Sequence, residues 1–272
     1  MKKWLGKGWR ITLRHKHAAA LLFAYRLLWG FFLYRLIDGV VTPILARYPD
    51  LHPNADAVPL FWIEAQFRLL RTDMADALLW LLAGLLALRM VITPLINAGL
   101  YYSFYHTDQG AKGGSLMRGI RQVWKPVFLL HLLENALVLL PALPLLGEAR
   151  NLMRDTGSVT LMLQKLLPYA AGWLIWLLTL RLLFRCLEFG AASRLGLKAG
   201  LSGFLRRALP LIGVTLLLAA VSLAASAAVS ASVYLWSGFA AVLIHQLSHL
   251  ARTLLSLWTA ASQFAVWQER AH

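Results

Sequence analysis

The stretch GKGWRITLRHKHAAALLFAYRLL at residues 6–28 decides the fold, because a basic helix in it runs directly into a long apolar segment. The same unit recurs as GGSLMRGIRQVWKPVFLLHLL at residues 113–133 and as AGLSGFLRRALPLIGVTLLL at residues 199–218. In each copy a second apolar segment follows and returns the chain. Because apolar helices of this length cross a bilayer, the repeat predicts a polytopic, all-α membrane bundle of three helical hairpins.

The composition excludes a soluble globular protein. Of the 272 residues 59% are apolar and 14% are charged, and the mean hydropathy is +0.62. A soluble core of this size has no room for so much Leu and Ala. The formal net charge is +15, but the cations follow the ends of apolar segments, which argues against nucleic acid as a partner. The single cysteine, Cys186, excludes a disulfide framework and a multi-cysteine metal site.

Six segments are long enough to cross the hydrocarbon core, which takes about 20 helical residues. They lie near residues 18–45, 76–105, 126–146, 167–190, 208–234 and 237–267. We therefore expect a single membrane domain over residues 1–272. Its remaining parts are a basic interfacial helix at 1–17, an outer loop with an interfacial helix at 47–75, and cytoplasmic basic helices at 107–125 and 191–207.

The charges of the loops predict the orientation. The segments before the first span, between the second and third, and between the fourth and fifth are basic, whereas acids balance the segment 47–76. By the positive-inside rule both termini are cytoplasmic. The first span follows lysines, as a signal peptide would, but it contains Arg26, Arg35 and Asp38 and no small-residue cleavage site. We expect it to remain in the mature protein.

The basic helices are amphipathic and are predicted to lie in the headgroup plane. In the first copy the cations oppose Leu5, Trp9 and Leu13 on a helical wheel. Each cation contributes about 1 kcal/mol toward an anionic leaflet. Such helices form either a collar that orients the bundle or a dedicated site for anionic lipid or a partner protein. The residues expected at lipid headgroups are Lys3, Lys7, Arg10, Arg14, Arg118, Arg121, Lys125, Arg206 and Arg207.

Ionisable residues inside the predicted spans are costly in lipid and are therefore candidates for function. The clearest pattern is a polar stripe on the sixth span, formed by His245, His249, Arg252, Ser256, Thr259 and Gln263 at spacings of three and four. The stripe is expected to face the protein interior or a hydrated crevice. The candidate ligand-binding residues are Arg26, Arg35, Arg89, His131, Glu134, Arg181, Arg185, His245, His249 and Arg252.

Three interpretations of these residues remain open. In the first, Asp38, Glu134 and Glu188 neutralise some of the arginines in a structural network. In the second, the excess of arginines lines a crevice for a lipid headgroup or small anion. In the third, His245 and His249 bind a metal with His131 or Glu134, since histidines at i and i+4 share a helical face. We expect no metal and no cofactor.

The fifth span carries Ser222, Ser226 and Ser230 at every fourth position among alanines. This small-xxx-small pattern favours close helix packing, either within the chain or in a homodimer. No nucleotide-binding or catalytic motif, such as a Walker loop, GxSxG or HExxH, is present. We therefore expect a protein that is not an enzyme.

Four stretches carry a family resemblance: FAYRLLWGFFLYRLIDGVVTPILARYPD at 23–50, PNADAVPLFWIEA at 53–65, VWKPVFLLHLLENALVLLPALPLL at 123–146 and ASQFAVWQER at 261–270. They resemble the membrane domain fused to bacterial glycerophosphodiester phosphodiesterases, and related uncharacterised Gram-positive multi-span proteins, over nearly all of the chain. In the fused enzymes the chemistry belongs to a soluble barrel with metal-binding His and acidic residues. These 272 residues include no such barrel. The resemblance therefore implies the membrane module alone, in a bacterial cytoplasmic membrane, with a role involving lipid or a lipid-derived polyol phosphate.

The sequence thus predicts a non-enzymatic membrane module that binds, senses or handles a lipid or small amphiphile through a polar intramembrane crevice. Its expected partners are membrane lipids with anionic headgroups, with a homodimer or a partner membrane protein as further possibilities. Two alternatives stay open. One is a transporter or permease component that moves a small solute, and the other is a membrane scaffold or assembly partner.

Overall fold

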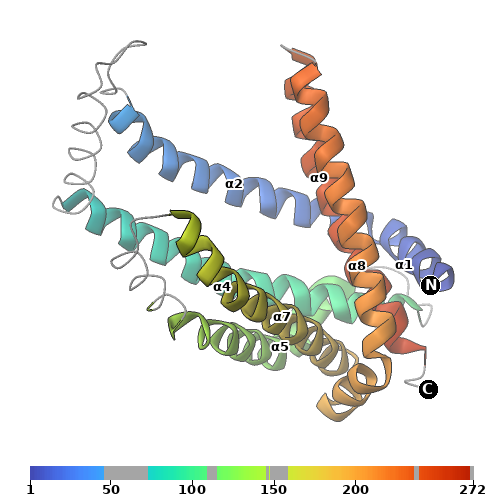
Figure 1. Ribbon diagram of the computed structural model, residues 1–272. Helices are drawn as coiled ribbons and strands as arrows, with labels where there is room; N and C mark the ends of the chain where they lie inside the picture. The colour runs from blue at the N-terminus through green and yellow to red at the C-terminus, as the bar shows by residue number, and fades with distance from the viewer. Residues whose placement is uncertain (46–72, 109–114, 145–146, 148–158, 236–238, 270–272) are drawn as a thin grey trace, which may run out of the picture. The chain divides into compact units, whose positions relative to one another are not determined.

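The computed structural model describes residues 1–45, 73–108, 115–144, 147, 159–235 and 239–269 (Figure 1). The helices are α1 (Lys2–Arg14), α2 (Lys16–Leu45), α4 (Asp73–Asp108), α5 (Ser115–Leu139), α7 (Val159–Ala192), α8 (Leu197–Leu235) and α9 (Phe239–Gln268). No strand occurs in the described ranges, and the prediction of an all-α fold is confirmed. The predicted outer loop at 47–75 lies outside the described residues, except that α4 begins within it at Asp73.

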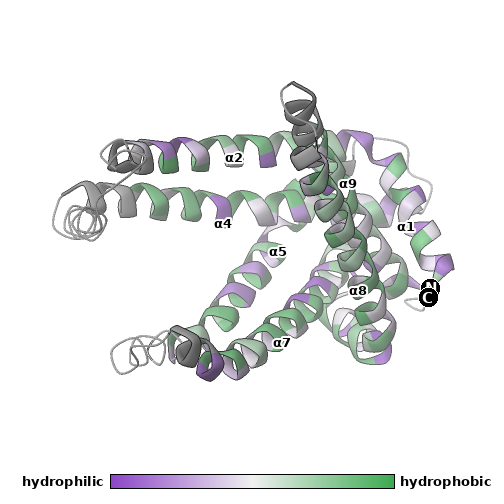
Figure 2. Ribbon diagram, turned by 45° about the horizontal axis from the view of Figure 1, so that its top comes forward, coloured by the Kyte–Doolittle hydropathy of each residue, from purple (hydrophilic) through white to green (hydrophobic). Residues whose placement is uncertain are grey.

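Five of the described helices contain segments long and apolar enough to cross a membrane: Lys16–Gly39, Trp80–Thr107, Leu116–Pro144, Gln164–Ala192 and Leu197–Ser232. In the most apolar 18-residue window of the first segment no residue is buried, and in the corresponding windows of the other four at most 17% are. The hydropathy colouring shows that α2, α4, α5 and α7 consist largely of apolar residues (Figure 2). Many of their large apolar side chains are exposed. Such surfaces are stable in contact with lipid, which supports a membrane protein.

Helix α9, where a sixth span was predicted near residues 237–267, is not among these five. It is as long as α2, but His245, Gln246, His249 and Arg252 interrupt its apolar sequence. Its length therefore agrees with a span, whereas these four polar residues lower the hydropathy of its sequence.

The described chain divides into two compact units, of which the first comprises Met1–Ala19 with Thr93–His272 and the second Ala20–Ile92. The second unit holds most of α2 and the first part of α4. There the Arg89 guanidinium lies over the Trp29 ring, 5.5 Å from its centroid, which is a cation–π contact between the two helices.

The core of the first unit is an aromatic cluster where α4, α7 and α9 end. Phe104 of α4, Phe189 of α7 and Phe264 of α9 are fully buried. The Phe189 ring lies 5.4 Å from Phe264 and 4.8 Å from Tyr101, in edge-to-face geometry. Aromatic pairs of this kind contribute about 1 kcal/mol each beyond the burial of their area. The ends of these helices are therefore fixed against one another, while their apolar lengths stay largely exposed.

Helices α5 and α7 run antiparallel. Trp173 and Trp176 of α7 donate their indole N–H groups to the Val138 and Leu137 carbonyls, at 3.2 and 3.1 Å. Those carbonyls lie in the last turn of α5, where no amide of the same helix is left to bond them. At the other end of the pair Arg194 donates to Gln122 Oε1 at 2.9 Å. These contacts set a register in which residues near 131 of α5 face residues near 184 of α7.

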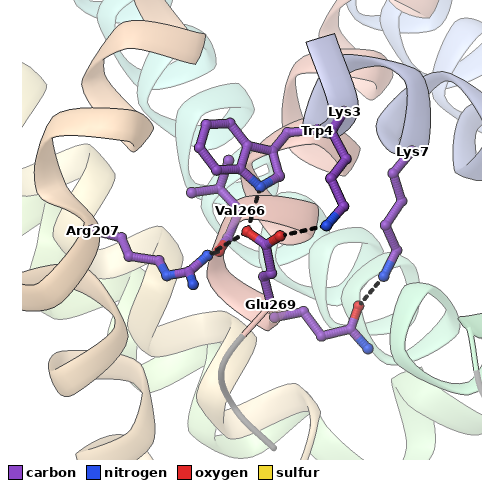
Figure 3. A network of polar contacts seen from close by, with 7 residues as sticks. Lys3, Trp4, Lys7, Arg207, Val266 and Glu269 are labelled. Carbon is purple, nitrogen blue, oxygen red and sulfur yellow. Dashed lines mark hydrogen bonds and ion pairs between the residues drawn. The ribbon is translucent and has the colours of Figure 1, made fainter. Parts of the chain in front are cut away.

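The N-terminal helix α1 packs on the C-terminal part of α9 (Figure 3). It buries Gly8, Ile11 and Thr12, and the Trp258 indole donates to the Leu5 carbonyl at 3.0 Å. On the predicted apolar face, the Trp9 ring lies 5.2 Å from the Trp258 ring of α9 in edge-to-face geometry. The side chains of Trp9 and Leu13 nevertheless stay partly exposed.

The carboxylate of Glu269, just beyond α9, joins three segments of the chain (Figure 3). Its oxygens accept from Lys3 Nζ at 2.9 Å, from the Trp4 indole at 2.7 Å and from Arg207 of α8 at 3.0 Å. These donors, with that of Lys3 the largest, lower the pKa of Glu269 to about 2. The carboxylate is consequently ionised at any physiological pH.

Each basic helix meets its span differently. In the first copy α1 and α2 are separated by a break at His15, whose φ is −105° and ψ 44°. In the second, α5 continues through Pro126 as one helix. In the third, α8 leaves helical geometry at Arg207, three residues before Pro210, since proline lacks an amide hydrogen and crowds the preceding turn. The prediction of an unbroken unit thus holds only for the second copy.

Candidate functional site

The candidate site is a group of ionisable side chains between α5 and α7. His131 and Glu134 are three residues apart on α5 and therefore share one helical face. The antiparallel register brings Glu188 of α7 against that face. One nitrogen of His131 and one carboxylate oxygen from each glutamate all lie within 4.8 Å of one another. We call His131, Glu134 and Glu188 the acid–histidine triad.

Two arginines of α7 flank the triad. Arg181 and Arg185 are four residues apart, and Arg185 precedes Glu188 by three, so all three side chains lie on neighbouring positions of one helical face. Arg181 is in electrostatic reach of His131 and Glu134, and Arg185 of Glu134 and Glu188. The triad and the two arginines together form the α5–α7 cluster.

A chain of hydrogen bonds leads from the cluster into α9 and α8. Arg185 donates to Gln263 Oε1 at 2.6 Å, and Gln263 donates from Nε2 to Thr215 Oγ1 at 2.7 Å. Thr215 in turn donates to the Leu211 carbonyl at 2.7 Å. The oxygen and the nitrogen of the Gln263 side chain, which is 1% exposed, are thereby both hydrogen-bonded. The guanidinium of Arg185 is consequently committed to α9.

Burial increases across the cluster. Arg181 is exposed, His131 and Glu134 are half-buried, and Glu188 is 3% exposed. Within the described residues, Glu188 Oε1 has no hydrogen-bond partner. A buried carboxylate oxygen without a partner is costly and usually marks a site with a role of its own. The cluster therefore leads from the surface of the first unit to an unsatisfied acid inside it.

The other predicted ligand-binding residues belong to the second unit and to α9. Arg26, Arg35 and Arg89 lie exposed on the second unit, where Arg26 and Arg89 interact electrostatically. On α9, His249 and Arg252 are exposed, and the side chain of His245 lies outside the described residues. Of the predicted polar stripe, Gln263 is the member that reaches Arg185.

The predicted headgroup cations fall into two groups. The first is exposed and consists of Arg10, Arg14, Arg118, Arg121, Lys125 and Arg206. The second consists of Lys3, Lys7 and Arg207, which bond Glu269 and Gln268 in the packing of α1 and α8 on α9. The small-residue stripe is on α8, where Ser222 and Ser226 are half-buried and Ser230 is exposed.

Sequence reasoning gave Glu188 only the role of a counter-charge and did not find Thr215 or Tyr101. The Tyr101 ring packs on Phe189 and its side chain lies near Arg185. Thr215 belongs to α8 and Tyr101 to α4, so no spacing within α7 reveals their proximity to Arg185. The three-residue spacing of Arg185 and Glu188 was the available signal for Glu188. Comparison of the chain with protein-family models, with curated proteins and with solved structures finds no match.

Proposed function

We propose that this chain is a non-enzymatic integral membrane protein that binds a lipid or small amphiphile at the α5–α7 cluster. The observation that carries this proposal is the exposure of Arg181 within an apolar span. Arg181 is 11 residues from Ala192, where the span Gln164–Ala192 ends, which is about 16 Å along the helix. A guanidinium at this depth needs an anionic partner that acyl chains do not provide.

Glu134 lies on one side of Arg181, and a lipid headgroup would supply an anionic partner on its exposed side. A phosphate accepts two parallel N–H bonds from one guanidinium, and the acyl chains of the same molecule cover the exposed leucines of the span. The neighbouring His131 and Glu134 are half-buried and offer hydrogen bonds to a polyol or ammonium group of the headgroup. The family resemblance in the sequence supports the same class of ligand.

The proposal includes the full predicted topology. It has six spans in three hairpins, each introduced by a basic cytoplasmic helix, with both termini on the cytoplasmic side of a bacterial membrane. The loop charges support this orientation. The partners proposed are anionic membrane lipids, together with a second copy of the chain or another membrane protein along the Ser222, Ser226 and Ser230 face of α8.

A second candidate is a transporter or permease component. The gradient of burial from exposed Arg181 to buried Glu188 favours it, since a solute that enters a membrane protein needs polar groups along its path. The third candidate function is that of a membrane scaffold. In that case the purified protein should retain no ligand.

Native mass spectrometry of the purified protein tests the proposal, with Arg181→Gln compared to Lys165→Gln. Lys165 is an exposed cation of the same helix, 16 residues or about 24 Å from Arg181. We expect the natural chain to retain a phosphate-bearing lipid and Arg181→Gln to lower retention at least tenfold, or about 1.4 kcal/mol. Equal retention by both variants, or no retained lipid, contradicts the proposal.

A further inference from the structure

The acid–histidine triad has the composition of a metal site rather than that of an ion-pair network. It combines one imidazole and two carboxylates from two adjacent helices, the arrangement by which helical bundles build metal sites in their interior. Its three ligand atoms lie within 4.8 Å of one another. Around a tetrahedral Zn²⁺ with metal–ligand distances of about 2.1 Å, ligand atoms are about 3.4 Å apart. Side-chain movements of about 1 Å therefore suffice to close the site.

The unpartnered oxygen of Glu188 is an independent indication of a ligand. Glu188 is 3% exposed, and within the described part of the chain its Oε1 receives no hydrogen bond. The obvious donor, Arg185, bonds Gln263 at 2.6 Å instead. If the cluster served only to neutralise charge, Arg185 would be expected to bond Glu188, its neighbour on the same helical face. The Glu188 carboxylate, one oxygen of which lies within 4.8 Å of ligand atoms of His131 and Glu134, is therefore left available to a cation.

We infer that His131, Glu134 and Glu188 bind a divalent transition-metal ion of the Zn²⁺, Mn²⁺ or Fe²⁺ class. Nitrogen and carboxylate ligands without a thiolate select these ions, and three protein ligands leave a coordination position open. This inference goes beyond the binding of a lipid and does not depend on it, because it is carried by Glu188 and not by Arg181.

The two arginines make the site distinguishable from adventitious binding. Their positive charges oppose a bound cation, so removal of one charge should strengthen the binding of the ion. Arg181→Gln is the suitable change, since Arg181 is exposed, whereas Arg185 holds the bond to Gln263. The same variant is expected to lose lipid and to gain metal affinity, which separates the two proposals in one protein.

The experiment uses the full chain in detergent, stripped with a chelator and titrated with Zn²⁺, and with Co²⁺ as a spectroscopic probe. The test variants are Glu188→Gln, Glu134→Gln and His131→Gln. The matched controls are Asp38→Asn, which removes an acid of α2, and His17→Gln, which removes an exposed imidazole. We expect one bound ion per chain, at least tenfold weaker binding in each test variant, unchanged binding in the controls and tighter binding in Arg181→Gln.

A stability measurement guards against misfolding of the variants. Glu188→Gln removes a buried carboxyl group with an unpartnered oxygen, so without metal it should unfold at the same temperature as the natural chain or a higher one. Zn²⁺ should raise the unfolding temperature of the natural chain and leave that of Glu188→Gln unchanged. The inference is overturned if the natural chain binds neither ion, or if Glu188→Gln binds both as tightly.

Discussion

Replacement of Gly8 by Ala distinguishes a helix α1 that is docked on α9 from one that lies free on the membrane surface. A Cβ atom at Gly8 would lie 2.7 Å from the backbone N and Cα of Ser262 and closer still to its hydroxyl. Ordinary contact begins at 3.4 Å, so the helices must separate by 3.4 minus 2.7, or 0.7 Å. The Ser262 backbone lies inside α9, which leaves no flexible side chain to absorb the movement.

The size of the effect follows from two opposing contributions. Separation of packed surfaces by 0.5–1 Å loses a quarter to a half of their dispersion energy, and overpacking costs up to about 3 kcal/mol. Ala is better than Gly inside a helix by about 1 kcal/mol. The docked helix should therefore be destabilised by about 2 kcal/mol, whereas a free helix should be stabilised by about 1 kcal/mol. The two arrangements give opposite signs.

Amide hydrogen exchange along α1, measured by mass spectrometry in lipid nanodiscs, reads out this local free energy. For Gly8→Ala we expect exchange about 30-fold faster in α1, and unchanged exchange in α5. Gly6→Ala is the matched control, because a Cβ there meets nothing within 4 Å, and it should slow exchange about fivefold. If Gly8→Ala slows exchange as Gly6→Ala does, α1 is not docked on α9 and the reasoning is refuted.

Two further predictions concern the charges around this packing. The pKa of Glu269 is lowered from 4.5 to about 2, so the stability it contributes is present above pH 4.5 and is lost as the pH falls toward 2. The protection factors of the α1 amides, which correct for the intrinsic pH dependence of exchange, should fall over that range. Glu269→Gln should show the low protection at every pH, and a natural chain with the same α1 protection at pH 3 and pH 6 would count against the contact. Replacing Arg118, Arg121 and Lys125 together by Gln should weaken binding to vesicles with anionic lipid, by up to about 3 kcal/mol at low ionic strength, while neutral vesicles serve as the control. Unchanged binding would mean that these cations only set the orientation.

The membrane class of the protein was predictable from the sequence because burial in lipid acts on every residue of a helix. A segment such as Leu197–Ser232 is recognised as a candidate membrane span by its length and composition alone. Five such segments occur in the described structure. The prediction of a sixth span depended on the apolar residues around His245 and His249, where the polar residues lower the hydropathy. Composition therefore identifies the five clear spans and leaves α9 undecided.

Contacts between helices were predictable only in part. The one-turn spacings of His131 with Glu134 and of Arg181 with Arg185 are properties of single helices, and both were found in the sequence. The contact of Glu188 with His131 and Glu134 depends on the register of α5 on α7. The bond between Arg185 and Gln263 depends in the same way on the register of α7 on α9. The register of α5 on α7 is set by Trp173 and Trp176, whose indoles donate to carbonyls near the end of α5. No hydrophobic period encodes such a bond.

The three basic helices are alike in sequence but differ in whether they are bonded to the core of the protein or remain exposed. At the break in the first copy, His15 donates from Nδ1 to the Ile11 carbonyl at 2.7 Å and meets the Ser103 hydroxyl of α4 through Nε2 at 2.8 Å. At the kink in the third copy, Arg207 bonds the Val266 carbonyl and Glu269. Both irregularities thus fix a basic helix to the core of the first unit.

The second copy has no such break, and its cations remain exposed along the straight first part of α5. The same helix continues to His131 and Glu134. Any force that an anionic leaflet exerts on Arg118 and Arg121 is therefore transmitted by one continuous helix toward the α5–α7 cluster. Because the first and third copies are tied to the core, we expect the second to determine how the membrane surface affects ligand binding at that cluster.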